Sequence, residues 1–140
     1  MTTLCCMTTS AASASYAGGM AKTRIRPLDG EAAIAAATAD GATASRDATA
    51  TATRYLLQCL ADAAQGNTVE VRVPPFGAVQ CIEGPGHTRG TPPNVVEMDA
   101  TTWLELATGR LTWAAGIAAA RIHASGQRAD LTGYVPVERP

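Results

Sequence analysis

The sequence lacks the usual signatures of a catalytic, redox or metal-binding protein. It contains no G-x-S-x-G, P-loop or H-E-x-x-H pattern, and no glycine-rich dinucleotide turn after an expected strand. Its four cysteines form no C-x-x-C pair, and Cys59 and Cys81 stand alone within apolar patterns. This cysteine usage indicates a reducing compartment and inert, buried thiols rather than a disulfide framework or a metal site.

Charge and long apolar runs are also scarce. The 140 residues include 11 basic and 12 acidic side chains without a basic stripe, so nucleic acid is not an expected partner. The longest apolar stretch, residues 114–120, is far shorter than the roughly 20 residues that span a bilayer. No transmembrane segment is therefore expected, and the length favours one cytoplasmic domain.

Residues 1–46 are predicted to be a disordered or weakly ordered leader and linker. Thr, Ser and Ala dominate up to Met20, and the first basic residue is Lys22, which is not the order of a secretory signal. A transit peptide and an alternative start at Met20 both stay open, so the sequence does not decide whether residues 1–19 belong to the native protein. One short helix is expected over residues 28–39, with Asp29 as its N-cap. The low content of bulky apolar residues predicts that this region contributes little to stability.

Residues 47–140 carry the periodicities of one α+β domain. Apolar residues recur at three-to-four spacing over residues 47–64, which predicts an amphipathic helix with one face toward a core. Valines then alternate with charged residues over 68–73, the pattern of a half-buried strand. Further strands are expected over 76–82, as an antiparallel neighbour of the first, and over 94–98.

Two short helices and a last strand complete the predicted domain. Asp99 is expected to cap the first of these helices, and Thr112 is expected to cap the second, which extends to Ala120. The strand is expected over residues 121–125, with His123 facing solvent. Residues 130–134 are predicted to form a brief closing helix or turn.

The two short helices are rich in alanine, so few bulky groups are available to fill the interior beside them. This composition favours an apolar ligand cavity, although ordinary core packing of both tryptophans stays open as the alternative. The residues predicted to line the cavity are Trp103, Leu106, Trp113, Ile117, Phe76 and Val79.

Polar functional side chains gather only in the glycine- and proline-rich segment of residues 84–93. Arg89, beside His87, could hold a carboxylate or phosphate in bidentate fashion, and both residues are predicted ligand contacts. The alternative is a rigid loop whose arginine pairs with Glu83 or Glu97.

A thiolate nucleophile is conceivable if Cys81 meets one of the two histidines. Nothing in the sequence orients either His87 or His123 for that chemistry. We therefore predict no catalytic residue and a non-enzymatic protein, with no metal and no cofactor.

Four segments resemble the sterol carrier (SCP-2-like) family. TWLELATGRL (residues 102–111) is similar to a helix of that family that ends in a small residue, glycine and a basic residue, and AAARIHASG (118–126) is similar to its alanine, basic residue, strand and glycine. VEVRVPPFGAVQ (69–80) and GPGHTRGTPPNVVE (84–97) resemble an actinobacterial branch called sterol carrier family proteins. The likeness covers about residues 47–137.

The resemblance implies an α+β fold with a curved, mostly antiparallel sheet of four to five strands backed by helices over an apolar cavity. It implies binding or carriage of a hydrophobic small molecule, such as a fatty acyl or sterol-like lipid. The C-terminal VERP is no peroxisomal address, so a eukaryotic trafficking role is not implied. Two alternatives stay open: a protein-interaction module with a vestigial cavity, and an enzyme acting on a small anionic substrate through His87 and Arg89. The sequence leaves the oligomeric state undetermined.

Overall fold

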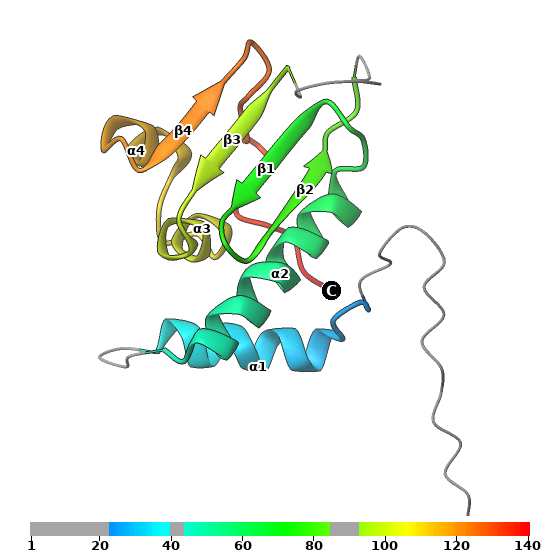
Figure 1. Cartoon of the computed structure of the whole chain (residues 1–140), viewed down its shortest axis with the longest axis vertical. Coiled ribbons are helices and arrows are strands. Elements are labelled where there is room, and N and C mark those ends of the chain that lie inside the picture. The colour runs from blue at the N-terminus through cyan, green and yellow to red at the C-terminus, as the bar shows by residue number, and fades with distance from the viewer. Residues whose placement is uncertain (1–22, 40–43, 85–92) are drawn as a thin grey trace, which may run out of the picture.

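The computed structural model describes residues 23–39, 44–84 and 93–140, and shows in them four helices and a four-stranded sheet (Figure 1). The helices are α1 (Pro27–Thr38), α2 (Arg46–Ala63), α3 (Ala100–Ala107) and α4 (Trp113–Ala118). The strands are β1 (Val69–Val73), β2 (Gly77–Cys81), β3 (Val95–Met98) and β4 (Ile122–Ser125). The predicted α+β class and the predicted order of elements are confirmed.

The sheet is open and mixed, with strand order β2-β1-β3-β4. β1 pairs antiparallel with β2 and parallel with β3, and β4 closes the far edge antiparallel to β3. Val71 stands opposite both Val79 and Val96, so these valines share one face of the sheet. Glu70 and Arg72 alternate with the buried valines of β1 and therefore lie on the opposite face.

The core lies between the valine face and helices α2 and α3. The apolar stripe of α2 follows the helical period, and Leu56 and Leu60 on it are fully buried. Trp103 of α3 is also fully buried, and its indole N–H donates to the Thr53 carbonyl of α2 at 3.2 Å. This bond gives the buried indole a partner and ties the two helices together.

Three helices begin at a side-chain cap. Ser45, Asp99 and Thr112 accept the backbone N–H three residues on, at 3.0, 2.7 and 3.1 Å. The caps predicted at Asp99 and Thr112 are thus confirmed. In the part of the chain that the structure describes, no helix has both the length and the apolar character needed to cross a membrane.

The predicted cap of the first helix was wrong. Asp29 lies inside the first turn of α1 and pairs with Arg26, which occupies the N-cap position without a side-chain cap bond. The reason is Pro27, whose fixed φ and missing N–H suit the first helical position, so the helix begins three residues earlier than it would with Asp29 as its N-cap.

α4 ends two residues before the predicted end at Ala120. Ala120 takes a φ of +56°, outside the helical range, and the Arg121 N–H donates to the Gly116 carbonyl at 3.0 Å. This left-handed residue turns the chain into β4. There Ile122 is buried, whereas Ala124, on the same face, is exposed at the sheet edge.

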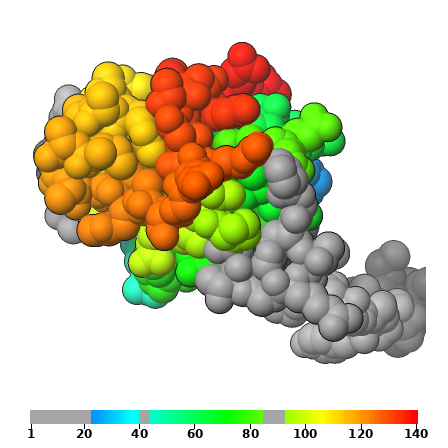
Figure 2. Space-filling view, turned by 90° about the horizontal axis from the view of Figure 1, so that it is seen from above, coloured from blue at the N-terminus to red at the C-terminus, as the bar shows by residue number. Residues whose placement is uncertain are grey.

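α1 packs on α2, on the side of the molecule away from β4 (Figure 1). Its buried residues are Gly30, Ala33 and Ile34. At the other end of the chain, the Val137 N–H donates to the Ala107 carbonyl at 2.9 Å, which fastens the C-terminal segment to the end of α3. Figure 2 shows this segment, in red, lying beside the yellow and orange residues of α3 to β4. The predicted closing turn is present, with the Tyr134 N–H donating to the Leu131 carbonyl at 2.9 Å.

Candidate functional site: an apolar cleft beside strand β2

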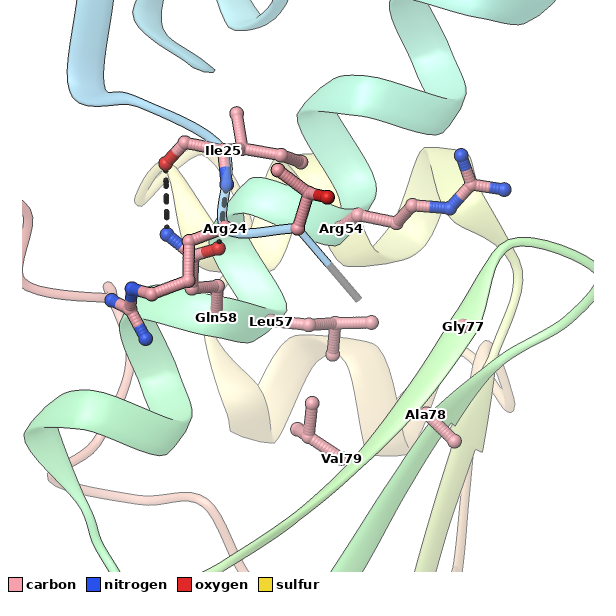
Figure 3. A pocket seen from close by; sticks show the side chains of 9 residues that line it. Arg24, Ile25, Arg54, Leu57, Gln58, Gly77, Ala78 and Val79 are labelled. Carbon is pink, nitrogen blue, oxygen red and sulfur yellow. Dashed lines mark hydrogen bonds between the residues drawn. The ribbon is translucent and has the colours of Figure 1, made fainter. Parts of the chain in front are cut away.

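A cleft of about 250 Å³ opens between residues 23–25, helix α2 and strand β2 (Figure 3). β2 is an edge strand that pairs only with β1 within the described ranges, which leaves its other side to the cleft. The lining residues are Thr23, Arg24, Ile25, Arg54, Leu57, Gln58, Gly77, Ala78 and Val79.

The cleft has an apolar floor. Leu57 is 2% exposed and Val79 is half-buried, and Figure 3 shows both side chains directed into the same space. Val79 reaches it because it shares the helix-covered face with Val71 but lies at the edge of the sheet. Gly77 leaves room there, since a Cβ at this position would stand 3.4 Å from Leu57 Cδ1. Contact with an apolar group is therefore the main interaction that this floor offers.

The side-chain amide of Gln58 holds residues 23–25, which form the wall of the cleft opposite β2, in place. Gln58 accepts from the Ile25 N–H and donates to the Ile25 carbonyl, both at 2.9 Å, so that the amide pairs with the backbone much as a neighbouring strand would. An exposed ion pair between Arg24 and Asp62 adds to this attachment and raises the pKa of the arginine. The segment is thus fixed to α2 although it lies in no helix or strand.

Phe76 organises the arginine end of the cleft. Its carbonyl accepts from Arg54 Nε at 2.9 Å, and its ring lies under the guanidinium of Arg46, 5.5 Å from the ring centroid. Phe76 was predicted to contact the ligand, but it is not among the residues that line this cleft. Its backbone instead holds Arg54 beside the opening.

The other side chains predicted for the site lie apart from one another. Trp103 and Leu106 are fully buried in the core and do not line the cleft beside β2. Trp113 is half-buried in a separate cleft of about 360 Å³ beside Pro136. Ile117 is 41% exposed and faces a shallow depression along β4. Of the predicted site residues that the structure describes, only Val79 lines the cleft beside β2.

His87 and Arg89 lie outside the described residues. The predicted loop site therefore stays a prediction, as does the role in which these two residues act on a small anion.

A cysteine–histidine nucleophile does not form between Cys81 and His123. Cys81 belongs to β2 and His123 to β4, at opposite edges of the sheet, and His123 faces solvent as predicted. Burial raises the pKa of the Cys81 thiol to about 11, the reverse of activation. In the described ranges, no three His, Cys, Asp or Glu side chains are grouped so as to hold a metal ion.

Four residues of the cleft were not predicted from the sequence as parts of a site: Ile25, Arg54, Gln58 and Gly77. Ile25 belonged to the supposed leader, and Gln58 is an ordinary polar residue on a helix flank. Ile25 and Gln58 have a role only through each other, 33 residues apart, and Arg54 has one through Phe76, 22 residues away. One signal was available: Ile25 is a bulky aliphatic residue in a segment that has few of them.

An open mixed sheet covered on one face by helices, with an apolar cleft at its edge, defines a small α+β domain suited to binding. Residues 45–137 match the family model described as "Bacterial SCP ortholog". The chain therefore belongs to this bacterial family of sterol carrier protein-like domains, which confirms the resemblance. No curated protein matches the chain.

Proposed function

We propose that this protein binds a hydrophobic small molecule, such as a fatty acyl or sterol-like lipid, and catalyses no reaction on it. The observation that carries the proposal is the apolar floor of the cleft, which Leu57 and Val79 form. The cleft is bounded by residues 23–25, which Gln58 holds in place through its two hydrogen bonds with Ile25. Membership of the bacterial SCP family supports it. The buried, protonated Cys81 thiol agrees with a binding role rather than nucleophilic catalysis.

The size of the cleft limits how much ligand it takes. About 250 Å³ is slightly below the roughly 300–1,000 Å³ typical of small-molecule sites. A short apolar ligand fits this volume whole, whereas a long lipid would leave part of its tail outside or would require the wall at Ile25 to move.

Native mass spectrometry of the purified full-length protein tests the proposal, with a co-purifying lipid as the expected result. Val79→Glu should remove that ligand, because a carboxylate on the apolar floor carries a desolvation cost. Gln80→Glu is the matched control, since it adds the same charge to the same strand at an exposed position. Loss of ligand from both variants, or no lipid on the wild type and no binding of added acyl or sterol probes, would refute the proposal.

A protein-interaction module is the second candidate, and one observation favours it. Trp103 and Leu106, which were predicted to line a cavity, are fully buried members of the hydrophobic core. A domain whose ligand cavity had become vestigial would have a packed core at the position of these two side chains. The same mass spectra separate the two candidates, because an interaction module would carry no lipid.

A further inference from the structure

The cleft beside β2 is electrostatically asymmetric. Two of its lining residues are arginines and none is acidic. At one end the charge of Arg24 is matched by Asp62. At the other end, among the residues that the structure describes, Arg54 donates only to a neutral carbonyl and has no carboxylate within 4.0 Å of its guanidinium.

A second cation strengthens the positive end. Arg46 covers the ring of Phe76 while Arg54 binds the carbonyl of the same residue. Arg46 also lacks an acidic partner within 4.0 Å among the described side chains. Two guanidinium groups therefore stand beside Phe76, where a bound anion would gain charge-assisted hydrogen bonds.

The apolar floor lies between the two ends. In Figure 3 the stems of Arg24 and Arg54 flank Leu57, and their guanidinium groups lie on opposite sides of the cleft. The stem of Arg54 also extends the apolar surface, as long basic side chains commonly do. A molecule with one anionic group and one apolar tail matches this arrangement in a single orientation.

We propose that the ligand of this cleft is a carboxylate amphiphile, with its carboxylate on Arg54 and its tail on Leu57 and Val79. This inference rests on the proposed function and narrows it, because it favours a fatty acid over a neutral lipid. Arg54 sets the preference for charge, and the floor supplies contact that acid and neutral ligands share.

The experiment compares octanoate with 1-octanol, which have the same chain length and differ in charge at neutral pH. Both are titrated into the full-length, ¹⁵N-labelled protein while the amide signals of Ile25, Gly77 and Val79 are followed by NMR. We expect both ligands to shift these signals, and octanoate to bind about tenfold more tightly, as one charge-assisted hydrogen bond at an exposed position would give.

Arg54→Gln should reduce this preference to less than about threefold, because it should weaken the binding of octanoate far more than that of 1-octanol, which loses only the apolar contact of the shortened stem. Arg54→Lys keeps the charge and should keep most of the preference. Arg110→Gln is the control, because Arg110 is exposed and donates to the Thr38 carbonyl, away from the cleft. The dispersion of the amide spectrum reports whether each variant is folded.

The outcomes separate this inference from the proposed function. Equal affinity of the wild type for both ligands would overturn the carboxylate proposal and leave hydrophobic binding intact. A preference for octanoate that persists in Arg54→Gln would also overturn it, because the anion would then be held elsewhere. If neither ligand shifts the cleft signals, both proposals fail at this site.

Discussion

The ring of Tyr55 lies directly against Gly30, so close that a Cβ at position 30 would stand 2.2 Å from the ring Cγ. This contact joins α1 to α2 and buries both residues. A glycine in the first turns of a helix normally lowers stability, yet here its missing side chain lets the two helices approach.

Gly30→Ala should therefore destabilise the protein, by about 1–3 kcal/mol, the usual cost of overpacking. Helix propensity alone predicts the opposite sign, a gain of roughly 1 kcal/mol. Chemical denaturation measures the difference. Ala35→Gly, at an exposed position of the same helix, is the control and should show only the propensity cost of about 1 kcal/mol. A more stable Gly30→Ala protein would mean that α1 does not pack on Tyr55.

Removal of residues 1–43 should lower the melting temperature by about 5–10 °C. The sequence predicts little contribution from this region, but the burial of Ile34 and Gly30 against α2 favours a measurable loss. For a domain near 100 residues, such a shift corresponds to roughly 1–2 kcal/mol. A protein that begins at Thr23 keeps α1 and the hydrogen bonds between Ile25 and Gln58, so its melting temperature should equal that of the full chain. If both truncated proteins melt at the same temperature, α1 adds little to stability, as the sequence predicts.

Ala120→Gly should stabilise the protein by about 1 kcal/mol. Ala120 adopts a φ of +56°, where an L side chain clashes with its own backbone and glycine does not. Ala119→Gly is the matched control, because its φ of −82° suits alanine, so this change should be neutral or slightly destabilising. If both substitutions lower the midpoint of unfolding, residue 120 is not held in the left-handed region.

Stability should fall as the pH rises through 9 to 11. Burial raises the pKa of the Cys81 thiol to about 11 and that of the Tyr55 phenol to about 12. The unfolded chain releases these protons at lower pH, so the stability contribution of Cys81 is complete below about pH 8 and is lost between roughly pH 9 and 11. For Cys81 the loss is on the order of 3 kcal/mol, because its pKa is raised from 9.0 to about 11 and each pKa unit corresponds to about 1.4 kcal/mol.

Thermal melts from pH 7 to 11 on the wild type and on Cys81→Ala measure this dependence. The variant should decline less steeply between pH 9 and 11, with a remaining slope from Tyr55. Parallel curves for the two proteins would show that the Cys81 thiol titrates normally in the folded state.

Local signals account for the elements that the sequence predicts well. The strict alternation of Val69, Val71 and Val73 with charged residues is enough to locate β1 and its buried face. Asp99 and Thr112 act on backbone groups three residues away, so short-range pattern suffices to identify both caps.

The cleft depends on contacts that no local pattern encodes. The hydrogen bonds between Gln58 and Ile25 join residues 33 positions apart, and the hydrogen bond from Arg54 to the Phe76 carbonyl joins residues 22 positions apart. The residues predicted to line a cavity show a related limit: alanine-rich helices suggest space beside them, but the indole of Trp103 is fully buried in the core. The amino-acid composition of a segment tells how large its side chains are, but it does not tell in which direction they point.

The parallel pairing of β1 with β3 has a consequence for the order in which the chain folds. Gly77 to Cys81 can pair with β1 through a short turn, whereas Val95 must meet Glu70 across 25 residues before the centre of the sheet exists. Closing the longer loop costs more chain entropy, and pairings between distant segments slow folding. The β1–β2 hairpin at one edge should therefore assemble first, and the hydrogen bonds at the middle of the finished sheet should be among the last to form.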